Sequence, residues 1–408
     1  MILKFGFTNF TSFKESVEVN FTFDGKTPKS ITNDFKVSTV LGIKGANGSG
    51  KTNILRALSF LSNICTMGAR THRFTTSKEN SEKPQKISVD SFFDNNDPIE
   101  FYIDFEFGGC EYSYELDMQN GAIIRELITK KEKSIRKLIE RNYNEITYRQ
   151  KSYEEFDNFE LREDKSIVEM LTQFKFRHDI TDLSNVYRFF IQMIFNVNYN
   201  GYHDLDLDFA EQTEEFYNKP LKFDFVKQLI KASDSSVHDI KIKVFKDHEG
   251  EDLYTPVFVH RCGNEFKELS FAKQSTGTQK LYQTLSAYFL VLSSGGVIAL
   301  DEFDVHLHAL ILPLLINLFI NPKINKTGAQ LIFTSHNTEI IDVLGKYRTY
   351  LVNKEDGESY GYRLDEIPGS MIRNDRPITP LYVSGKIGGI PESVDLYLEK
   401  LMEDLQNG

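Results

Sequence analysis

The hydrophobic positions near the N-terminus predict strands, a loop and a helix in that order. Residues 2–7 and 17–23 are short β-type runs on either side of a polar turn, which indicates a hairpin. A third apolar run, residues 37–43, leads directly into a glycine-rich stretch. After it, residues 53–65 carry apolar side chains at helical intervals. The chain therefore opens as an α/β fold does, with a strand joined to an amphipathic helix by a tight loop.

In the next part of the chain, apolar and polar residues alternate, as they do in strands with one buried face. Residues 99–107 and 112–116 alternate apolar and polar positions around Gly108-Gly109, which predicts a second hairpin. β-type segments continue from there to residue 148. We therefore expect an antiparallel β subdomain over residues 85–150.

Helical spacing returns further along the chain and predicts an insertion. We expect residues 151–264 to be mostly helical, with strands near the end that return to the core. The stretches with helical spacing are residues 167–174, 186–195 and 223–232. The expected return strands are residues 239–244 and 256–260.

The closing third alternates helix and strand, which is typical of a largely parallel sheet. The expected helices are residues 275–292, 306–319 and 338–344, and the expected strands are residues 296–300, 330–335 and 349–353. Together with the N-terminal elements, they predict an α/β core made of residues 1–65 and 265–408. A chain of 408 residues has room for the two or three units that this division requires.

Composition is that of a globular protein, with 40% apolar and 26% charged residues. The sequence has no apolar run of about 18 to 20 residues, and its first residues lack the zones of a signal peptide, so we expect a cytoplasmic location and no membrane partner. Cys65, Cys110 and Cys262 lack C-x-x-C spacing, which argues against a disulfide framework or a zinc site. A net charge of -11 disfavours broad binding to nucleic acid, although a local basic groove stays open as an alternative.

One loop carries the strongest chemical signal. It matches the pattern G-x-x-x-x-G-K-[ST] in full and reads Gly45-Ala46-Asn47-Gly48-Ser49-Gly50-Lys51-Thr52. Its glycines let backbone N–H groups point at phosphate oxygens, and the following helix adds its N-terminal dipole. We expect Lys51 to reach the β- and γ-phosphates of ATP and Thr52 to ligate Mg²⁺. A chance match is disfavoured, because a strand and a helix flank the loop in the order that a phosphate site needs.

Two adjacent carboxylates end the apolar run of residues 296–300. Alternation along a strand sends Asp301 and Glu302 in different directions, so they can take different roles. Asp301 suits Mg²⁺, directly or through water, and Glu302 suits the general base that activates water. The alternative is that both acids merely cap the next helix.

Two further motifs help to separate the types of P-loop protein. Ser275-Thr276-Gly277 precedes a long amphipathic helix and places a hydroxyl and free amides at its N-terminus, where phosphate binds well. His336 ends the buried-type strand of residues 330–335 and is a candidate contact for the γ-phosphate or the attacking water. The alternatives are an ordinary helix cap for Ser275 and a structural role for His336.

In this order, the motifs resemble the ATP-binding-cassette superfamily, in the branch shared by SMC, RecF and OLD-type proteins. The resemblance covers roughly residues 1–60 and 265–355 and includes Asn9-Phe10-Thr11-Ser12-Phe13. It implies two ATP molecules held between two head domains. Ser275, Thr276 and Gly277 would then act in trans on ATP held by the partner's loop, in a homodimer or a higher homo-oligomer.

Three strings look closer still to the stand-alone AAA-family ATPases of bacterial abortive-infection and anti-phage systems. They are STGTQK at residues 275–280, DEFDVHLH at 301–308 and GKIGGIP at 385–391. The resemblance implies a separately encoded effector, either a nuclease or a toxin. The chain departs from the cassette pattern at the signature, which has Gln274-Ser275-Thr276-Gly277 in place of Leu-Ser-Gly-Gly. His308 stands where transporter-type cassettes carry an aspartate, as is usual in the OLD-like branch.

Several functions compete on these motifs. We expect a defence ATPase that senses infection or controls an effector, and the main alternative is a RecF-like clamp on duplex DNA. An assembly scaffold with little turnover is a third interpretation, which the presence of Glu302 disfavours. Intrinsic nuclease activity is not expected, because the segment after His336 is too short for the Toprim domain of OLD-type nucleases and has no D-x-D.

Overall fold

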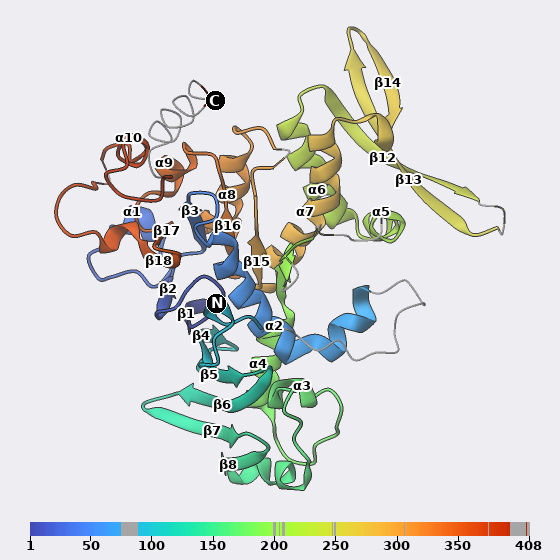
Figure 1. Cartoon of the computed structure of the whole chain (residues 1–408). Helices are drawn as coiled ribbons and strands as arrows, with labels where there is room; N and C mark the ends of the chain where they lie inside the picture. Colours follow the sequence, from blue (N-terminus) through green and yellow to red (C-terminus); the bar gives the residue numbers. More distant parts are fainter. Residues whose placement is uncertain are drawn as a thin grey trace.

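Two large β-sheets, with helices around them, make up most of the fold (Figure 1). The computed structural model describes residues 1–74, 89–198, 201–203, 205, 209–246, 248, 250–305, 307–373, 375–391 and 405. The first sheet has the strand order β18-β17-β3-β16-β15-β9, and all neighbours are parallel except β17 and β18. Its strands are β3 (Val40–Gly45), β9 (Met193–Phe195), β15 (Val297–Leu300), β16 (Gln330–Thr334), β17 (Thr349–Glu355) and β18 (Glu358–Arg363). The largely parallel sheet that we expected is confirmed, and the fold class is α/β.

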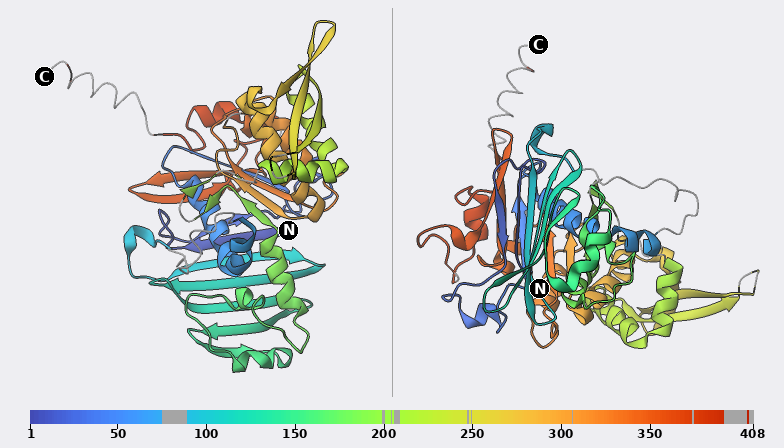
Figure 2. Two further views of the ribbon diagram at one scale, coloured as in Figure 1. Left: turned by 90° about the vertical axis from the view of Figure 1, so that its right-hand side faces the viewer. Right: turned by 90° about the horizontal axis from the view of Figure 1, so that it is seen from below.

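The second sheet is antiparallel and has seven strands in the order β2-β1-β4-β5-β6-β7-β8 (Figure 2, left view). Both expected hairpins lie in it, and β1 pairs with β4 as well as with β2. The sheet therefore continues across the boundary that we propose between residues 1–65 and 85–150. Its strands are β1 (Ile2–Thr8), β2 (Val17–Asn20), β4 (Ile99–Phe107), β5 (Cys110–Gln119), β6 (Ala122–Lys131), β7 (Ile135–Asn142) and β8 (Glu145–Arg149).

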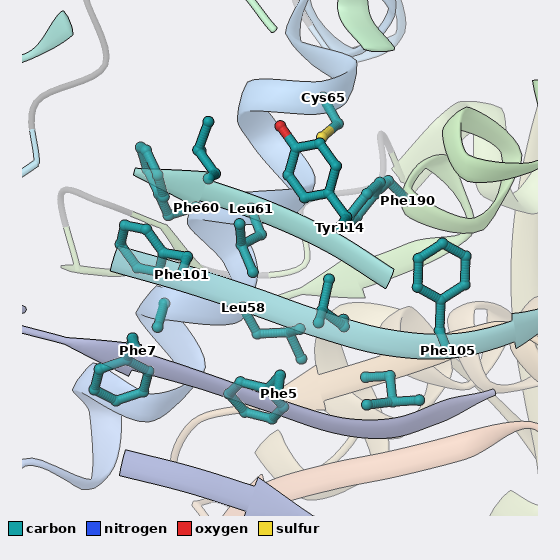
Figure 3. Packing of buried hydrophobic residues seen from close by; sticks show 14 of the residues in the cluster. Phe5, Phe7, Leu58, Phe60, Leu61, Cys65, Phe101, Phe105, Tyr114 and Phe190 are labelled. Atoms are coloured by element: carbon teal, nitrogen blue, oxygen red, sulfur yellow. The ribbon is translucent and has the colours of Figure 1, made fainter. Parts of the chain in front are cut away.

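Helix α2 (Lys51–Phe74) joins the two sheets through one hydrophobic core. Figure 3 shows side chains of α2 against those of β1 and β4, and the rings of Phe60 and Phe101 lie 5.0 Å apart. Leu58 and Leu61 are fully buried in the same cluster. Since α2 begins at Lys51, the helix that follows the glycine-rich loop is fixed over residues 54–65 by apolar packing.

A second hydrophobic cluster covers the other side of the parallel sheet. It contains side chains of five helices that lie between residues 209 and 344. Among them, α7 packs against both α6 and β15. These helices are α5 (Phe209–Asn218), α6 (Pro220–Ser233), α7 (Thr276–Ser294), α8 (Leu312–Ile320) and α9 (Ile340–Leu344). Helix α8 begins later than expected: residues 309–311 form a turn and Pro313 lies in the first turn of the helix, while residue 306 lies outside the described residues.

Two predicted helices of the insertion are partly wrong. Helical spacing over residues 167–174 suggested one helix, but Ile167–Met170 forms α3 and residues 171–173 form turns. Helical spacing over residues 186–195 suggested a single helix, but α4 (Thr181–Ile191) ends early and Met193–Phe195 forms β9, parallel to β15 at the edge of the main sheet. Apolar residues lie on both sides of Gln192, which alone separates the helix from the strand, and periodicity cannot separate a short buried strand from a helix end. The insertion therefore supplies a strand to the largely parallel sheet.

The expected position of the two return strands was also wrong. Residues 239–244 and 256–260 are strands, but they form a separate sheet, β12-β13-β14, that projects from the core (Figure 1). Charged and apolar residues alternate along β12, which suits a partly exposed strand, whereas strands of a parallel core are apolar on both faces. The strands are β12 (Val237–Lys246), β13 (Asp252–Cys262) and β14 (Glu265–Ser270).

Short elements complete the described fold. They are α1 (Lys29–Thr32), α3 (Ile167–Met170), β10 (Val197–Asn198), β11 (Gly201–Tyr202) and α10 (Thr379–Val383), with 3₁₀ turns at Phe92–Asp94, Lys151–Asn158, Phe271–Lys273 and Leu364–Glu366. Among the helices that the structure describes, none combines the length and the apolar character needed to cross a membrane.

Candidate functional site

Three parallel strands end at one edge of the main sheet, and the residues at the end of each strand belong to the candidate site. Strand β16 lies between β3 and β15, so the carboxyl ends of all three are neighbours. Gly45 ends β3, Asp301 follows β15 and Ser335 follows β16. Ligands of open α/β sheets bind at such an edge.

The loop after β3 has the backbone that a phosphate cradle requires. Gly48 and Gly50 have φ angles of 75° and 106°, in the left-handed region that favours glycine. A Cβ atom on Gly45 would lie 2.3 Å from the carbonyl oxygen of Val352, so this position also needs glycine. The side-chain oxygen of Ser49 is buried and has no hydrogen-bond partner within the described residues. The loop therefore fits a ligand that brings acceptors, as a polyphosphate does.

Lys51 is held inside this loop. Only 7% of the residue is exposed, and Nζ donates hydrogen bonds to the carbonyl oxygens of Gly45 and Ala46, both at 2.9 Å. Burial lowers the pKa of Lys51, and the carboxylates of Asp301 and Glu302 oppose that shift. A partly desolvated ammonium enclosed by carbonyl groups is prepared to receive an anion.

Thr52 and Asp301 come together, although 249 residues separate them. The Thr52 hydroxyl donates to Oδ2 of Asp301 at 2.9 Å, and the Thr334 hydroxyl donates to Oδ1 at 2.6 Å. A hydroxyl and a carboxylate are the hard oxygen donors that Mg²⁺ prefers, so these residues fit that ion. Among the described residues, no three His, Cys, Asp or Glu side chains gather as a metal site, so nucleotide and water oxygens would complete the coordination of Mg²⁺.

Glu302 lies beside Asp301 but faces outward. Strand β15 ends at Leu300, and the chain then turns through a φ of 50° at Glu302, so a left-handed turn separates the two carboxylates where we expected strand alternation to do so. The backbone N–H of Glu302 donates to the Thr334 hydroxyl at 2.8 Å. Thr334 thus fixes both acidic residues, and the exposed carboxylate of Glu302 is within reach of water.

His336 lies on the loop after β16, with an exposed side chain. Its backbone N–H donates to Asp304 Oδ2 at 3.0 Å, and the N–H of Asn337 donates to the same oxygen at 2.9 Å. Asp304 therefore holds the loop that carries His336 against the turn that carries Glu302. Asp304 was not among the residues predicted for the site, although it lies three positions after Asp301 in the string DEFD.

Asn196 was not predicted for the site either; it lies between β9 and β10 and is 7% exposed. Its side-chain amide donates to the carbonyl oxygen of Asp301 at 2.8 Å and accepts from the N–H of Asp301 at 2.6 Å. No local signal could have found this residue, because it directly follows the stretch of residues 186–195 that the pattern predicts to be helical.

The candidate signature lies at the start of α7. Ser275 is the N-cap of this helix: its hydroxyl accepts from the N–H of Thr278 at 3.2 Å. Ser275 and Thr276 are exposed and Gly277 is half-buried. Within the described residues, the Ser275 side chain hydrogen-bonds to Thr278 and not to the loop from Gly45 to Thr52 of its own chain. The exposed cap stays available to a second molecule.

A strand, a glycine-rich loop and a helix, with an acidic strand end bonded to that loop, define a P-loop ATPase. A family model described as "AAA domain, putative AbiEii toxin, Type IV TA system" matches residues 40–342. Since the match covers most of the chain, the protein belongs to this family. Among curated proteins, no sequence matches the chain.

Solved structures of SMC heads are similar to this chain. The SMC head domain from Thermotoga maritima has a TM-score of 0.43 at 13% identity, over 89% of this chain and 98% of that chain. An SMC head bound to the C-terminal winged-helix domain of ScpA has a TM-score of 0.44 at 14% identity, over 90% and 99%. An SMC head from Pyrococcus furiosus with an extended coiled coil, bound to the C-terminal domain of ScpA, has a TM-score of 0.40 at 14% identity, over 90% and 97%.

Proposed function

We propose that this chain hydrolyses ATP at the carboxyl edge of its parallel sheet and uses ATP to join two copies of itself. The observation that carries the proposal is the hydrogen bond from Thr52 to Asp301 beside the buried ammonium of Lys51. It brings together a hydroxyl, a carboxylate and a cation at the loop that fits a polyphosphate. P-loop ATPases use these groups to bind ATP and stabilise charge during phosphoryl transfer.

Each residue has a role in this mechanism. Lys51 binds the phosphates through its ammonium, and the N–H groups of residues 45–52 surround them. Mg²⁺, held by Thr52 and Asp301, would offset the negative charge that develops on the phosphate oxygens. Glu302 accepts a proton from the attacking water as general base, which accounts for a factor of about 10²–10⁴ in rate in comparable cases. His336 contacts that water or the γ-phosphate.

The exposed signature explains why two copies are needed. Ser275, Thr276 and Gly277 present a hydroxyl and the free N–H groups at the start of the 19-residue helix α7. Because, in the part of the chain that the structure describes, the Ser275 side chain bonds to Thr278 and not to the phosphate loop of its own chain, we propose that these residues contact ATP held by a partner copy. A homodimer, or a higher homo-oligomer, would then bind two ATP molecules.

Gel filtration tests this proposal directly. With ATP and Mg²⁺, Glu302→Gln should accumulate as a dimer or a larger assembly, because ATP is bound but not consumed. Lys51→Ala should stay in the ATP-free state and should not bind ATP. A Glu302→Gln protein whose size does not respond to ATP would contradict a shared site, and retention of full ATPase activity by this variant would contradict the role of Glu302.

We further propose that ATP-driven association controls a separately encoded effector, a nuclease or a toxin, in defence against phage. The family description, which names a putative toxin of a toxin–antitoxin system, supports this context. Cells that carry the chain with its genomic neighbours should resist phage, and Lys51→Ala should abolish that resistance. Wild-type cells without resistance would contradict the defence role and leave the ATPase role standing. Stimulation of turnover by duplex DNA would favour a DNA clamp, the alternative function, over effector control.

A further inference from the structure

A buried lysine lies directly before the phosphate-binding loop. Lys44 is the penultimate residue of β3, and only 1% of it is exposed. All six residues of β3 are buried, and most of them are apolar. An ammonium in such a place is costly unless other groups compensate its charge and satisfy its hydrogen bonds, so its contacts indicate its role.

Within the described residues, both hydrogen bonds of Lys44 Nζ go to the loop after β16. Its Nζ donates to the carbonyl oxygen of Ser335 at 2.5 Å and to that of Asn337 at 2.9 Å. These are the two residues on either side of His336. The ring of Tyr382, on α10, covers Nζ at 5.9 Å from the ring centroid, a cation–π distance.

Asp304 completes the arrangement from the opposite side of the same loop. Lys44 donates to the carbonyl groups of the two residues that flank His336. The Asp304 carboxylate accepts from the N–H groups of His336 and Asn337. The negative charge of Asp304 also raises the pKa of Lys44, against the larger lowering by burial. The backbone around His336 is therefore held by a cation from the strand before the phosphate loop and by an anion from the turn after β15.

We propose that Lys44 is a positioning residue for His336, which it holds at a fixed place relative to the phosphate-binding loop. Lys44 touches no expected ligand atom and acts through the two carbonyl groups. Since β3 continues directly into the loop at Gly45, any movement of the loop after β16 away from ATP would have to break both hydrogen bonds. Displacement of a reacting group by about 1 Å can cost about 100-fold in rate, so this restraint matters for turnover. The inference rests on the ATP hydrolysis proposed above.

Steady-state ATPase kinetics of Lys44→Met test the inference. We expect kcat to fall by about 10- to 100-fold while KM for ATP stays within about twofold, because Lys51 and the loop that bind ATP are unchanged. The matched control is Lys354→Met, which removes an exposed lysine from the neighbouring strand β17 and should leave both constants unchanged.

A double variant separates positioning from general loosening of the fold. If Lys44 acts through His336, Lys44→Met combined with His336→Ala should be no slower than His336→Ala alone. Losses that multiply, an unchanged kcat in Lys44→Met, or a loss that falls on KM would each overturn the inference. If Lys44→Met does not fold, Lys44→Gln keeps N–H donors without the charge and should give a smaller loss of the same kind. Failure of both variants to fold would show a purely structural role. A wild-type protein without ATPase activity would contradict the proposed function instead.

Discussion

The side-chain amide of Asn196 pairs with both backbone groups of Asp301, which is 105 residues away in the chain. A neighbouring strand normally makes such a pair of hydrogen bonds, and here β9 ends one residue before Asn196. The amide thus extends the sheet by one position, to the residue whose carboxylate meets Thr52. The acid that we expect to ligate Mg²⁺ is fixed through its backbone as well as through Thr334.

Replacing Asn196 should therefore damage both the fold and the candidate magnesium site. Asn196→Ala leaves two buried backbone groups of Asp301 without partners, at a cost of about 1–3 kcal/mol each in the free energy of unfolding. We also expect a higher Mg²⁺ concentration for half-maximal ATPase activity. Urea denaturation and a Mg²⁺ titration check the two effects. The control is Asn144→Ala, at an exposed turn. If Asn196→Ala has the same stability and the same Mg²⁺ requirement as this control, the role of Asn196 is contradicted.

The parts of the site that the sequence predicts are those with local signals. A loop from Gly45 to Lys51 needs its glycines within a few residues of one another, and the acids at Asp301 and Glu302 directly follow an apolar run. Asn196 has no such signal, because its role depends on the long-range pairing of β9 with β15. Lys44 was missed for a related reason: its partners are backbone carbonyl groups on another strand end, which leave no mark on the sequence.

In the fold too, elements with local signals were predictable and those that depend on long-range pairing were not. The parallel sheet was predictable, because alternating helices and strands allow few other arrangements. The place of β9 was not, since three apolar residues after a helix look like more helix. The projecting sheet was misplaced for another reason: a period of two identifies β12 and β13 as strands but does not say which sheet they join.

A methyl group at Gly50 should weaken ATP binding. Gly50 has a φ of 106°, and a Cβ atom there would lie 2.8 Å from the Ser12 hydroxyl oxygen and 2.9 Å from that of Ser359. Gly50→Ala would strain the backbone beside Lys51, at a cost of about 1–3 kcal/mol, and would push apart the two serines, which hydrogen-bond to each other. We expect the Kd for ATP, measured with a fluorescent analogue, to rise at least about tenfold, which corresponds to 1.4 kcal/mol.

The control for this prediction is Gly25→Ala. Gly25 has no atom within 4 Å of a built Cβ and no positive φ, so the same substitution should leave the Kd unchanged. Equal affinities for the two variants would show that the loop tolerates a side chain at Gly50, contrary to its role as a phosphate cradle.

The buried ammonium of Lys44 should make stability depend on pH in a defined window. Burial lowers the pKa of Lys44 from 10.5 to about 8, with Asp304 raising it and Lys51 lowering it. Between these values the unfolded chain holds a proton that the folded chain has lost, so the contribution of Lys44 to the free energy of unfolding rises with pH. Below about pH 8 both states are protonated and the contribution is constant.

Comparison with Lys44→Met isolates this effect from other titrating groups. The free energy of unfolding of the wild type minus that of the variant should increase by about 1–3 kcal/mol between about pH 7 and pH 10. Urea denaturation at both pH values measures it. A difference that does not change with pH, or that shrinks, would mean that Lys44 keeps an ordinary pKa in the folded protein.

A fully buried ion pair lies in the antiparallel sheet, and removal of its cation should destabilise the fold strongly. Arg141 and Glu126 have fully buried side chains, and Nε of Arg141 lies 3.1 Å from Oε2 of Glu126. Glu126 also accepts hydrogen bonds from the hydroxyl groups of Tyr114 and Ser166, at 3.0 and 2.6 Å. Arg141→Met would leave the carboxylate buried without its cation, which costs about 3–5 kcal/mol in comparable cases.

Two further variants make this last prediction specific. Glu126→Gln added to Arg141→Met removes the uncompensated charge and should restore part of the lost stability, measured as the free energy of unfolding in urea. Lys4→Met breaks an ion pair with Glu18 whose side chains are 37% and 44% exposed, and it should cost no more than about 1 kcal/mol. Equal losses for Lys4→Met and Arg141→Met would contradict the reasoning, because the large cost is expected only where water cannot replace the missing partner.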